Sequence, residues 1–356
     1  MKLLLNGYFY RNLGDDLFFH IIANRYPNHQ FYAMIHGDHA DAYKGVSNVK
    51  VLPQTKLLRG LDKVLFKLSP SMSLYAQKGK KMDASILIGG SMFIEMYDDG
   101  YDLKRLRAMP QNRKGLYIMG INFGPHKTQG YLDACREYLA TATDVCFRDA
   151  TSYGLFSDLP NTRCGSDIVF GIEAICPRAE EKRNVCVISV MDFGANPALA
   201  PYEADYLAFV TDMIRHQHAQ GREVELVSFC AWEGDERAME KILARCDDPD
   251  KVRLLKYDGQ NWRQVCRHIS SAACMVASRF HSVVLGLAWG VPTLAISYSN
   301  KTVQLLKDMG CGNKAVLPQM LAQLKPETAE YISGLDMTSW RQKAETHFEK
   351  LDALLK

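Results

Sequence analysis

The sequence predicts an α/β protein made of two doubly wound domains that face a cleft. A chain of 356 residues exceeds what one ordinary hydrophobic core organises. Short apolar runs alternate with longer segments of helical period, which is typical of βα units around parallel sheets. A short charged joint with a proline, "ICPRAEEKRN" at 175–184, separates two such series and is interpreted as an interdomain linker.

Each half has its own strands and helices. In the first half we expect strands at 2–6, 30–35, 49–52, 84–88, 115–119 and 144–147, and helices at 15–26 and 130–143. In the second half we expect strands at 185–190, 223–229, 252–255, 273–277 and 293–297, and helices at 202–220, 234–246 and 262–270. The predicted domains are therefore 1–175 and 184–334, and the amphipathic segment within 335–356 is predicted to form a closing helix.

Composition and charge exclude several classes of protein. The apolar fraction of 47% and the charged fraction of 23% are typical of a soluble globular protein, and no apolar run is long enough to span a bilayer. None of the ten cysteines forms a C-x-x-C pair, which favours reduced thiols in a cytoplasmic protein over disulfides or a zinc site. A net charge of +3 is too small to predict nucleic-acid binding and is compatible with an anionic small-molecule ligand. We expect no metal and no bound cofactor.

Ligands of doubly wound sheets lie beyond the carboxyl ends of the strands, so residues there are the candidate site. The first strand leads through "NGYFYRNLGDDLFF" into a helix, with Gly14 in the turn and Asp15 or Asp16 as its cap. The ordinary interpretation is a capped turn. The functional interpretation is that Asn12 and Asp15 contact the hydroxyls of an acceptor. The turn lacks the G-x-G-x-x-G pattern, which disfavours NAD.

Three further strand ends in the first half carry polar side chains. "ILIGGSMF" places Ser91 where it can cap a following helix, and amides at a helix start favour an anion. "IMGINFGP" presents Asn122 between glycines. "VCFRDATSYGLF" ends a strand on Arg148 and Asp149. Either these two pair with each other while Asp149 caps the next helix, or Arg148 faces the ligand.

The strongest signal is "ASRFHSVVLGLAWGVPTLAISYSNK" at 277–301. Arg279 and His281 follow a strand and stand at a helix N-terminus. A second strand follows, and Lys301 begins the helix after it. A cation there is poorly matched to the helix dipole unless an anion lies nearby. Arg279, His281 and Lys301 are therefore predicted to converge on one acidic ligand, and His281 can also move a proton near neutral pH.

These residues resemble those of the polysaccharide pyruvyl transferase family. The matching pieces are "NLGDD", "GGSMF", "GINFGP", "CFRDATSYGLF", "GSDIVFG" and the stretch from "SRFHS" through "GVPTLAISYSNK", in family order from about residue 6 to residue 310. The ordered set is more specific than any one piece. The family is similar in architecture to the GT-B glycosyltransferases, in which two Rossmann-like domains face a cleft and a C-terminal helix packs back on the first domain.

The resemblance implies transfer of a pyruvyl group from phosphoenolpyruvate to two hydroxyls of a sugar, giving a cyclic ketal in a cell-envelope polysaccharide or its precursor. Phosphoenolpyruvate is a co-substrate, and the acceptor is a sugar or a lipid-linked oligosaccharide. His281 is implied as the general acid and base, with Arg279 at the donor's phosphate or carboxylate. Lys301, Arg148, Tyr298 and Ser278 complete the implied donor site. The implied acceptor side consists of Asn12, Asp15, Ser91 and Asn122.

One departure keeps two alternatives open. Members of the family typically carry an arginine just after the first strand of the second domain, where this chain has Met191 and Asp192 in "VISVMDFGANP". The alternatives are a GT-B glycosyltransferase that uses a nucleotide sugar and a non-catalytic protein that binds a sugar or an anion. Retention of Arg279, His281 and Lys301 favours an enzyme.

A basic stretch at 56–81 stands apart from these motifs. It holds seven basic residues against the single acidic Asp62, and its leucines recur at helical spacing. The ordinary interpretation is a helix with a solvated basic face. The alternative is peripheral contact with the anionic inner face of a membrane, where a lipid-linked acceptor lies.

Overall fold

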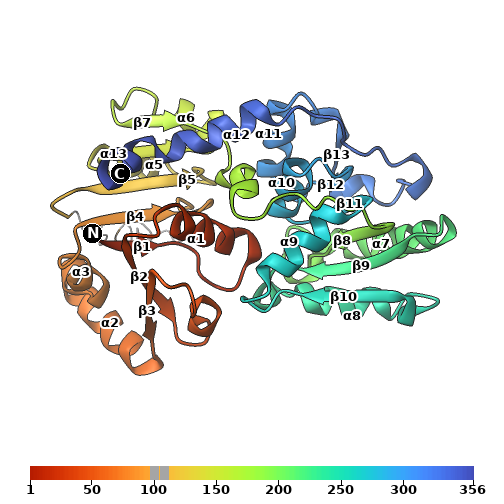
Figure 1. The fold of residues 1–356 in the computed structure, drawn as a ribbon, viewed down its shortest axis with the longest axis horizontal. Coiled ribbons are helices and arrows are strands. Elements are labelled where there is room, and N and C mark those ends of the chain that lie inside the picture. The colour runs from red at the N-terminus through yellow and green to blue at the C-terminus, as the bar shows by residue number, and fades with distance from the viewer. Residues whose placement is uncertain (97–103, 105–111) are drawn as a thin grey trace. The chain divides into compact units, whose positions relative to one another are not determined.

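The computed structural model describes residues 1–96, 104 and 112–356, and it contains two compact units (Figure 1). Unit 1 comprises Met1–Phe9, Phe18–Gly171 and Thr338–Lys356. Unit 2 comprises Tyr10–Leu17 and Ile172–Met337. The segment Tyr10–Leu17, which includes the start of the first helix, therefore belongs to the same unit as the second sheet.

Unit 1 is built on a sheet of seven parallel strands in the order β3-β2-β1-β4-β5-β6-β7. The central strands are buried on both faces, because helices flank an all-parallel sheet on each side. The strands are β1 (Lys2–Asn6), β2 (Gln30–His36), β3 (Val49–Gln54), β4 (Ala84–Ile88), β5 (Leu116–Ile121), β6 (Asp144–Phe147) and β7 (Thr162–Cys164).

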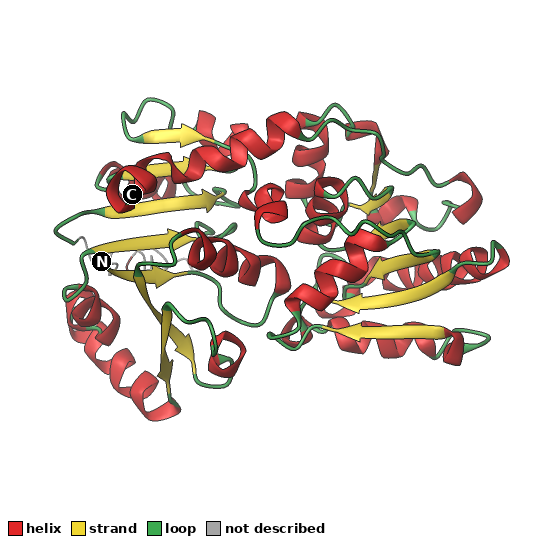
Figure 2. Ribbon diagram, viewed as in Figure 1, coloured by secondary structure: helices red, strands yellow, loops and turns green. Residues whose placement is uncertain are grey.

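The described helices around this sheet are short to medium in length (Figure 2). They are α1 (Leu13–Arg25), α2 (Lys56–Leu68), α3 (Leu74–Gly79), α5 (Gln129–Ala140), α6 (Ala150–Gly154), α12 (Thr338–Glu345) and α13 (Glu349–Leu355). Phe147 and Phe156 stack in the core with ring centroids 5.4 Å apart. Such aromatic pairs add to the free energy gained by burying apolar area.

Unit 2 repeats the plan with six parallel strands in the order β10-β9-β8-β11-β12-β13. Its strands are β8 (Val185–Ser189), β9 (Glu223–Ser228), β10 (Val252–Lys256), β11 (Cys274–Ala277), β12 (Thr293–Ile296) and β13 (Ala315–Val316). Its α-helices are α7 (Glu203–Ala219), α8 (Asp235–Leu243), α9 (Trp262–Ser271), α10 (Phe280–Ala288) and α11 (Asn300–Asp308). The strand order reverses between β8 and β11, which marks the usual ligand edge of a doubly wound sheet.

The C-terminal segment packs against the strands of unit 1, as predicted, although it is not one continuous helix. Residues Thr346–Phe348 form a tight 3₁₀ turn between α12 and α13. His347 lies buried in this turn, where its Nδ1 accepts from the Gly120 N–H at 3.1 Å and its Nε2 donates to the Ser166 carbonyl at 2.6 Å. Arg25 binds Asp352 through two nitrogens and fixes α13 on α1.

The predicted strands and helices are present, with ends that differ by a few residues. Two short strands, β7 and β13, were missed because three and two residues are too few to show a period. Two local expectations were wrong. Helix α1 begins at Leu13, so Asp15 and Asp16 lie inside its first turn. No helix starts in the described residues 89–96, so Ser91 caps none there.

Candidate functional site

Arg279 is held by carboxylates at the start of α10. Arg279 directly precedes the first helical residue, and its side chain is only 7% exposed. Its Nε donates to Asp235 Oδ1 at 3.0 Å, and its Nη2 binds the same oxygen. Its Nη1 donates to Glu233 Oε2. The guanidinium is therefore engaged on two sides in this structure.

The two carboxylates differ in how freely they can exchange their partners. Asp235 is fully buried, and its Oδ2 accepts from the N–H groups of Phe229 and Cys230 at 2.8 and 2.9 Å. The Glu233 side chain is 31% exposed. Burial lowers the pKa of Arg279, but the charges of Asp235 and Glu233 outweigh burial and raise it above the usual value. Arg279 therefore stays charged at any pH of interest.

A buried serine network fixes the turn between β11 and α10. Ser189 Oγ, at the end of β8, accepts from the Ser278 N–H at 2.9 Å and donates to Ser282 Oγ at 2.7 Å. Tyr206 donates to Ser278 Oγ at 3.1 Å, and burial raises the pKa of Tyr206 to about 12, so its hydroxyl keeps its proton. These bonds tie together the ends of the two strands at which the sheet order reverses. Ser278 thus positions this turn.

The "NLGDD" segment packs on the same edge of unit 2. Asn12 Nδ2 donates to Glu233 Oε1 at 3.2 Å, so Glu233 bridges Asn12 and Arg279. A Cβ added to Gly14 would lie 1.8 Å from Nδ1 of His281. Only a glycine fits against this imidazole, because real Cβ atoms do not approach so closely. The close packing of Gly14 against His281 therefore brings the "NLGDD" and "SRFHS" motifs together.

Two further contacts hold this segment in place. Tyr257 donates to the buried Asp16 Oδ2 at 2.7 Å. The Leu13 N–H donates to the Phe229 carbonyl at 2.9 Å. Asp15 lies in the same helical turn and is half-buried.

His281 and Lys301 both lie near the ring of Phe280. His281 is 9% exposed, and its ring meets that of Phe280 edge-on with centroids 5.2 Å apart. Lys301 Nζ lies 5.9 Å from the centroid of the Phe280 ring, on the first turn of α11. Tyr298 is half-buried and contributes to the electrostatic surroundings of Arg279. Six predicted site residues therefore gather at one edge of unit 2: Asn12, Ser278, Arg279, His281, Tyr298 and Lys301.

The departure at Met191 and Asp192 has a structural explanation. Asp192 follows β8 and binds Arg237 Nε at 3.0 Å and Lys241 Nζ at 2.9 Å, both from α8. Burial raises the pKa of Asp192, but the hydrogen bonds from Lys241 and Arg237 outweigh burial and lower it below its usual range. Lys241 also binds Glu203 at 2.6 Å. Asp192 is thus an ionised anchor for α8.

Three more predicted site residues, Ser91, Asn122 and Arg148, form a second cluster in unit 1, whereas Asp15 lies in unit 2. Arg148 donates to Asp167 Oδ2 at 2.9 Å and to Asn122 Oδ1 at 2.6 Å, and Ser91 donates to the same oxygen of Asn122 at 3.1 Å. Arg148 therefore pairs with Asp167 and not with Asp149, which caps α6 through the Ser152 N–H. Four of the quoted motifs of the first half meet in this buried cluster.

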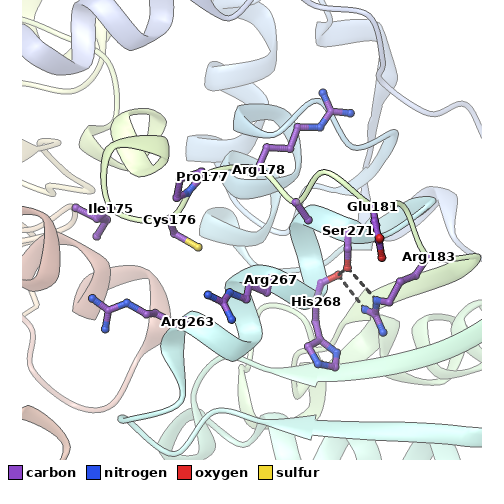
Figure 3. Close-up of a pocket in the computed structure, with 11 residues that line it drawn as sticks. Ile175, Cys176, Pro177, Arg178, Glu181, Arg183, Arg263, Arg267, His268 and Ser271 are labelled. Atoms are coloured by element: carbon purple, nitrogen blue, oxygen red, sulfur yellow. Dashed lines mark hydrogen bonds between the residues drawn. The ribbon is translucent and has the colours of Figure 1, made fainter.

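A separate groove of about 560 Å³ in unit 2 is lined by arginines from the linker and from α9 (Figure 3). Two of the residues that line the groove, Arg183 and His268, bind the buried Glu225. The groove is lined by none of the predicted site residues.

Within 1–96, 104 and 112–356, no group of three His, Cys, Asp or Glu side chains could hold a metal ion. In the same residues no helix is long and apolar enough to cross a bilayer.

Sequence reasoning missed the carboxylates that bind the two predicted site arginines, Arg279 and Arg148. Glu233 and Asp235 lie in "SFCAWEGDERAME", directly beyond the carboxyl end of β9, so the strand-end rule could have singled them out. Asp167 follows the short strand β7, which has no detectable period. No local signal marks Tyr257 as the partner of Asp16, because the two meet only through folding.

The profile of polysaccharide pyruvyl transferases matches residues 12–300, which include every predicted site residue except Lys301. The chain belongs to the polysaccharide pyruvyl transferase family. This result confirms the resemblance drawn from the ordered motifs, since the match begins at Asn12 and ends at the first residue of α11.

Known proteins provide two further comparisons. The chain is 20% identical to the amylovoran biosynthesis protein AmsJ of Erwinia amylovora over 276 residues, which are 70% of this chain and 64% of that protein. The chain thus spans less than two thirds of the relative's length. Among solved structures, UDP-GlcNAc 2-epimerase of Neisseria meningitidis superposes with a TM-score of 0.62 at 9% identity over 99% of this chain and 100% of that one.

A second epimerase has the same fold. UDP-GlcNAc 2-epimerase of Methanocaldococcus jannaschii superposes with a TM-score of 0.57 at 8% identity, over 99% of this chain and 100% of that one. At such low identity these likenesses concern the fold alone. They confirm two Rossmann-like domains of the GT-B type.

Proposed function

We propose that the chain transfers a pyruvyl group from phosphoenolpyruvate to two hydroxyls of a sugar in a polysaccharide or its precursor. In this reaction the methylene carbon of the donor takes a proton and becomes a methyl group. Two sugar oxygens form bonds to the adjacent carbon, and the bond from that carbon to the phosphate oxygen breaks. One of the two hydroxyl protons replaces the proton that the methylene carbon takes up, and the other leaves on the phosphate. The products are a cyclic ketal and hydrogen phosphate.

The observation that carries the proposal is the packing of Gly14 against His281. It brings the turn after the first strand to the imidazole at the ligand edge of unit 2. In the proposed reaction His281 delivers the proton to the methylene carbon and afterwards accepts one from an attacking hydroxyl. A histidine suits both steps, because its ordinary pKa lies near neutral pH.

The proposed donor site uses Arg279 and Lys301. Glu233 is the exposed one of the two carboxylates on Arg279, so the donor's phosphate or carboxylate can take its place while Asp235 keeps the guanidinium oriented. A bidentate arginine suits a planar carboxylate or a phosphate. Ser278 positions the turn, and Tyr298 completes this side of the site. Arg148 stays a predicted donor ligand, and its partners Asn122 and Asp167 orient it.

The proposed acceptor site uses Asn12 and Asp15. Asn12 lies next to Glu233, so displacement of Glu233 by the donor frees the Asn12 amide for a sugar hydroxyl. Ser91 and Asn122 stay predicted acceptor ligands. A cytoplasmic site of action stays a prediction, which rests on the lack of any C-x-x-C pair among the ten cysteines.

The first test measures thermal stability with phosphoenolpyruvate, with UDP, with GDP and without ligand. A ligand at about a hundred times its dissociation constant adds roughly 2.7 kcal/mol to the free energy of unfolding. We expect phosphoenolpyruvate alone to stabilise the protein. Stabilisation by a nucleoside diphosphate alone would contradict the proposal and indicate a glycosyltransferase, and no response to any of the three would indicate a non-catalytic protein.

The second test addresses the role of His281. We expect His281→Ala to abolish phosphate release from phosphoenolpyruvate in the presence of an acceptor, while the thermal shift caused by the donor remains. Unchanged turnover would remove His281 from the mechanism.

A further inference from the structure

Helix α2 exposes its apolar side chains. Leu57, Leu58, Leu61, Val64 and Leu68 are 84%, 41%, 49%, 57% and 70% exposed. They are half of the ten large apolar side chains that are exposed in the described part of the chain, and they all lie on one helix of 13 residues. No residue of α2 is buried. Single exposed leucines are common on protein surfaces, whereas a concentrated group marks an interaction surface.

The exposed residues form a stripe with a basic border. Leu57, Leu61, Val64 and Leu68 are spaced by four, three and four residues, so they share one face of the helix. Lys56, Lys63 and Lys67 are spaced by seven and four residues and lie along one side of the stripe. This order of apolar face and basic flank is typical of helices that lie in the plane of a membrane interface.

The other side of α2 attaches it to unit 1. Figure 1 shows α2 next to β3, the edge strand of the sheet. Asp62, the one acidic residue of the helix, accepts from the Leu74 N–H at 2.5 Å and so turns toward α3. Leu65 and Phe66 are half-buried beside it. The attachment uses Asp62, Leu65 and Phe66, and it leaves the five exposed apolar side chains and the three lysines outward.

We propose that α2 docks on the surface of an anionic lipid bilayer. Its exposed leucines insert at the boundary between headgroups and acyl chains, and its lysines contact the headgroups. Charge decides between this partner and a second copy of the chain. A symmetric contact of two α2 faces would bring the same basic side chains of both copies together, which repel. Anionic headgroups instead neutralise them, and each lysine near such a surface strengthens binding about fivefold.

The test is sedimentation of the full chain with vesicles of phosphatidylcholine containing phosphatidylglycerol, and with vesicles of phosphatidylcholine alone. We expect binding to the anionic vesicles and at least tenfold weaker binding to the neutral ones. We expect Leu57→Gln/Leu61→Gln to abolish binding at low and high salt. We expect Lys63→Gln/Lys67→Gln to weaken it roughly 30-fold at low salt, from the loss of two charges.

Matched controls separate docking from general effects. Leu254→Gln removes another exposed leucine, and Lys307→Gln/Lys350→Gln removes two charges elsewhere, so neither should change vesicle binding. The substituted α2 side chains are exposed, so the variants should keep the thermal stability of the parent. Absence of binding to anionic vesicles, or equal loss in the controls, would overturn the proposal. A dimer that Leu57→Gln/Leu61→Gln dissociates would instead assign α2 to an interface between copies.

Discussion

The ion pair between Arg279 and Asp235 allows a quantitative prediction about the stability of unit 2. Arg279→Met leaves Asp235 fully buried with only the N–H groups of Phe229 and Cys230 as partners. Removing one partner of a buried pair costs about 3–5 kcal/mol, because the other charge stays desolvated. The bond to Glu233 adds little to this cost, since Glu233 is partly exposed.

Substitution of the other partner, Asp235, should lower the free energy of unfolding by less. Asp235→Asn keeps Arg279 paired with Glu233 and loses a charge-assisted hydrogen bond, worth about 1.5–3 kcal/mol. In the double variant neither buried charge remains, so its cost should fall short of the sum of the single costs by about 2 kcal/mol.

Urea-induced unfolding of the parent, both single variants and the double variant measures these four free energies. Circular dichroism at neutral pH is a suitable probe, and equal slopes against urea would validate the comparison. Additive costs, or a loss below about 1 kcal/mol for Arg279→Met, would refute the reasoning. In that case the guanidinium would be solvated and available, and the proposed exchange of Glu233 for the donor would lose its basis.

Three further predictions concern the site and the closing segment. Gly14→Ala should displace the imidazole of His281 and lower kcat at least tenfold, whereas Gly130→Ala, whose added Cβ meets nothing within 4 Å, should leave kcat unchanged; equal effects would contradict the packing. Glu233→Gln should tighten phosphoenolpyruvate binding by up to about fivefold in calorimetry, because a partly exposed charge that competes for the guanidinium is worth up to about 1 kcal/mol. Weaker binding would contradict the proposed exchange of Glu233 for the donor. Burial lowers the pKa of His347 to about 4 from 6.5, so the unfolded chain binds a proton first as the pH falls, and stability should drop by about 3 kcal/mol between pH 6.5 and pH 4. Urea unfolding across this pH range should show the drop in the parent and a flatter profile in His347→Gln.

The proposed function and the proposed docking surface fail independently. Donor binding and the His281 variant test unit 2, while the vesicle experiments test α2 of unit 1. A protein that binds phosphoenolpyruvate but no vesicles keeps the enzyme assignment, and one that binds vesicles but no donor keeps the docking surface.

The sequence by itself determined the α/β class, most of the strands and the position of one part of the candidate site. The strands β4 and β6 were predicted with their observed ends, because each is an apolar run that is buried along its whole length. Arg279 and His281 were placed correctly just after β11, at the start of α10, because a strand followed directly by a helix puts these residues at the carboxyl edge of the sheet. These are local relations, and a local pattern of hydrophobicity reports them.

The partners of those residues were decided only by the tertiary structure. Glu233 and Asp235 meet Arg279 because β9 and β11 lie on either side of β8, and this register is set by packing across the whole sheet. Gly14 meets His281 because the segment Tyr10–Leu17 folds with unit 2 and not with the strand that precedes it. Pairings between residues far apart in the chain depend on how faces are buried against each other, and no single stretch of sequence contains that information.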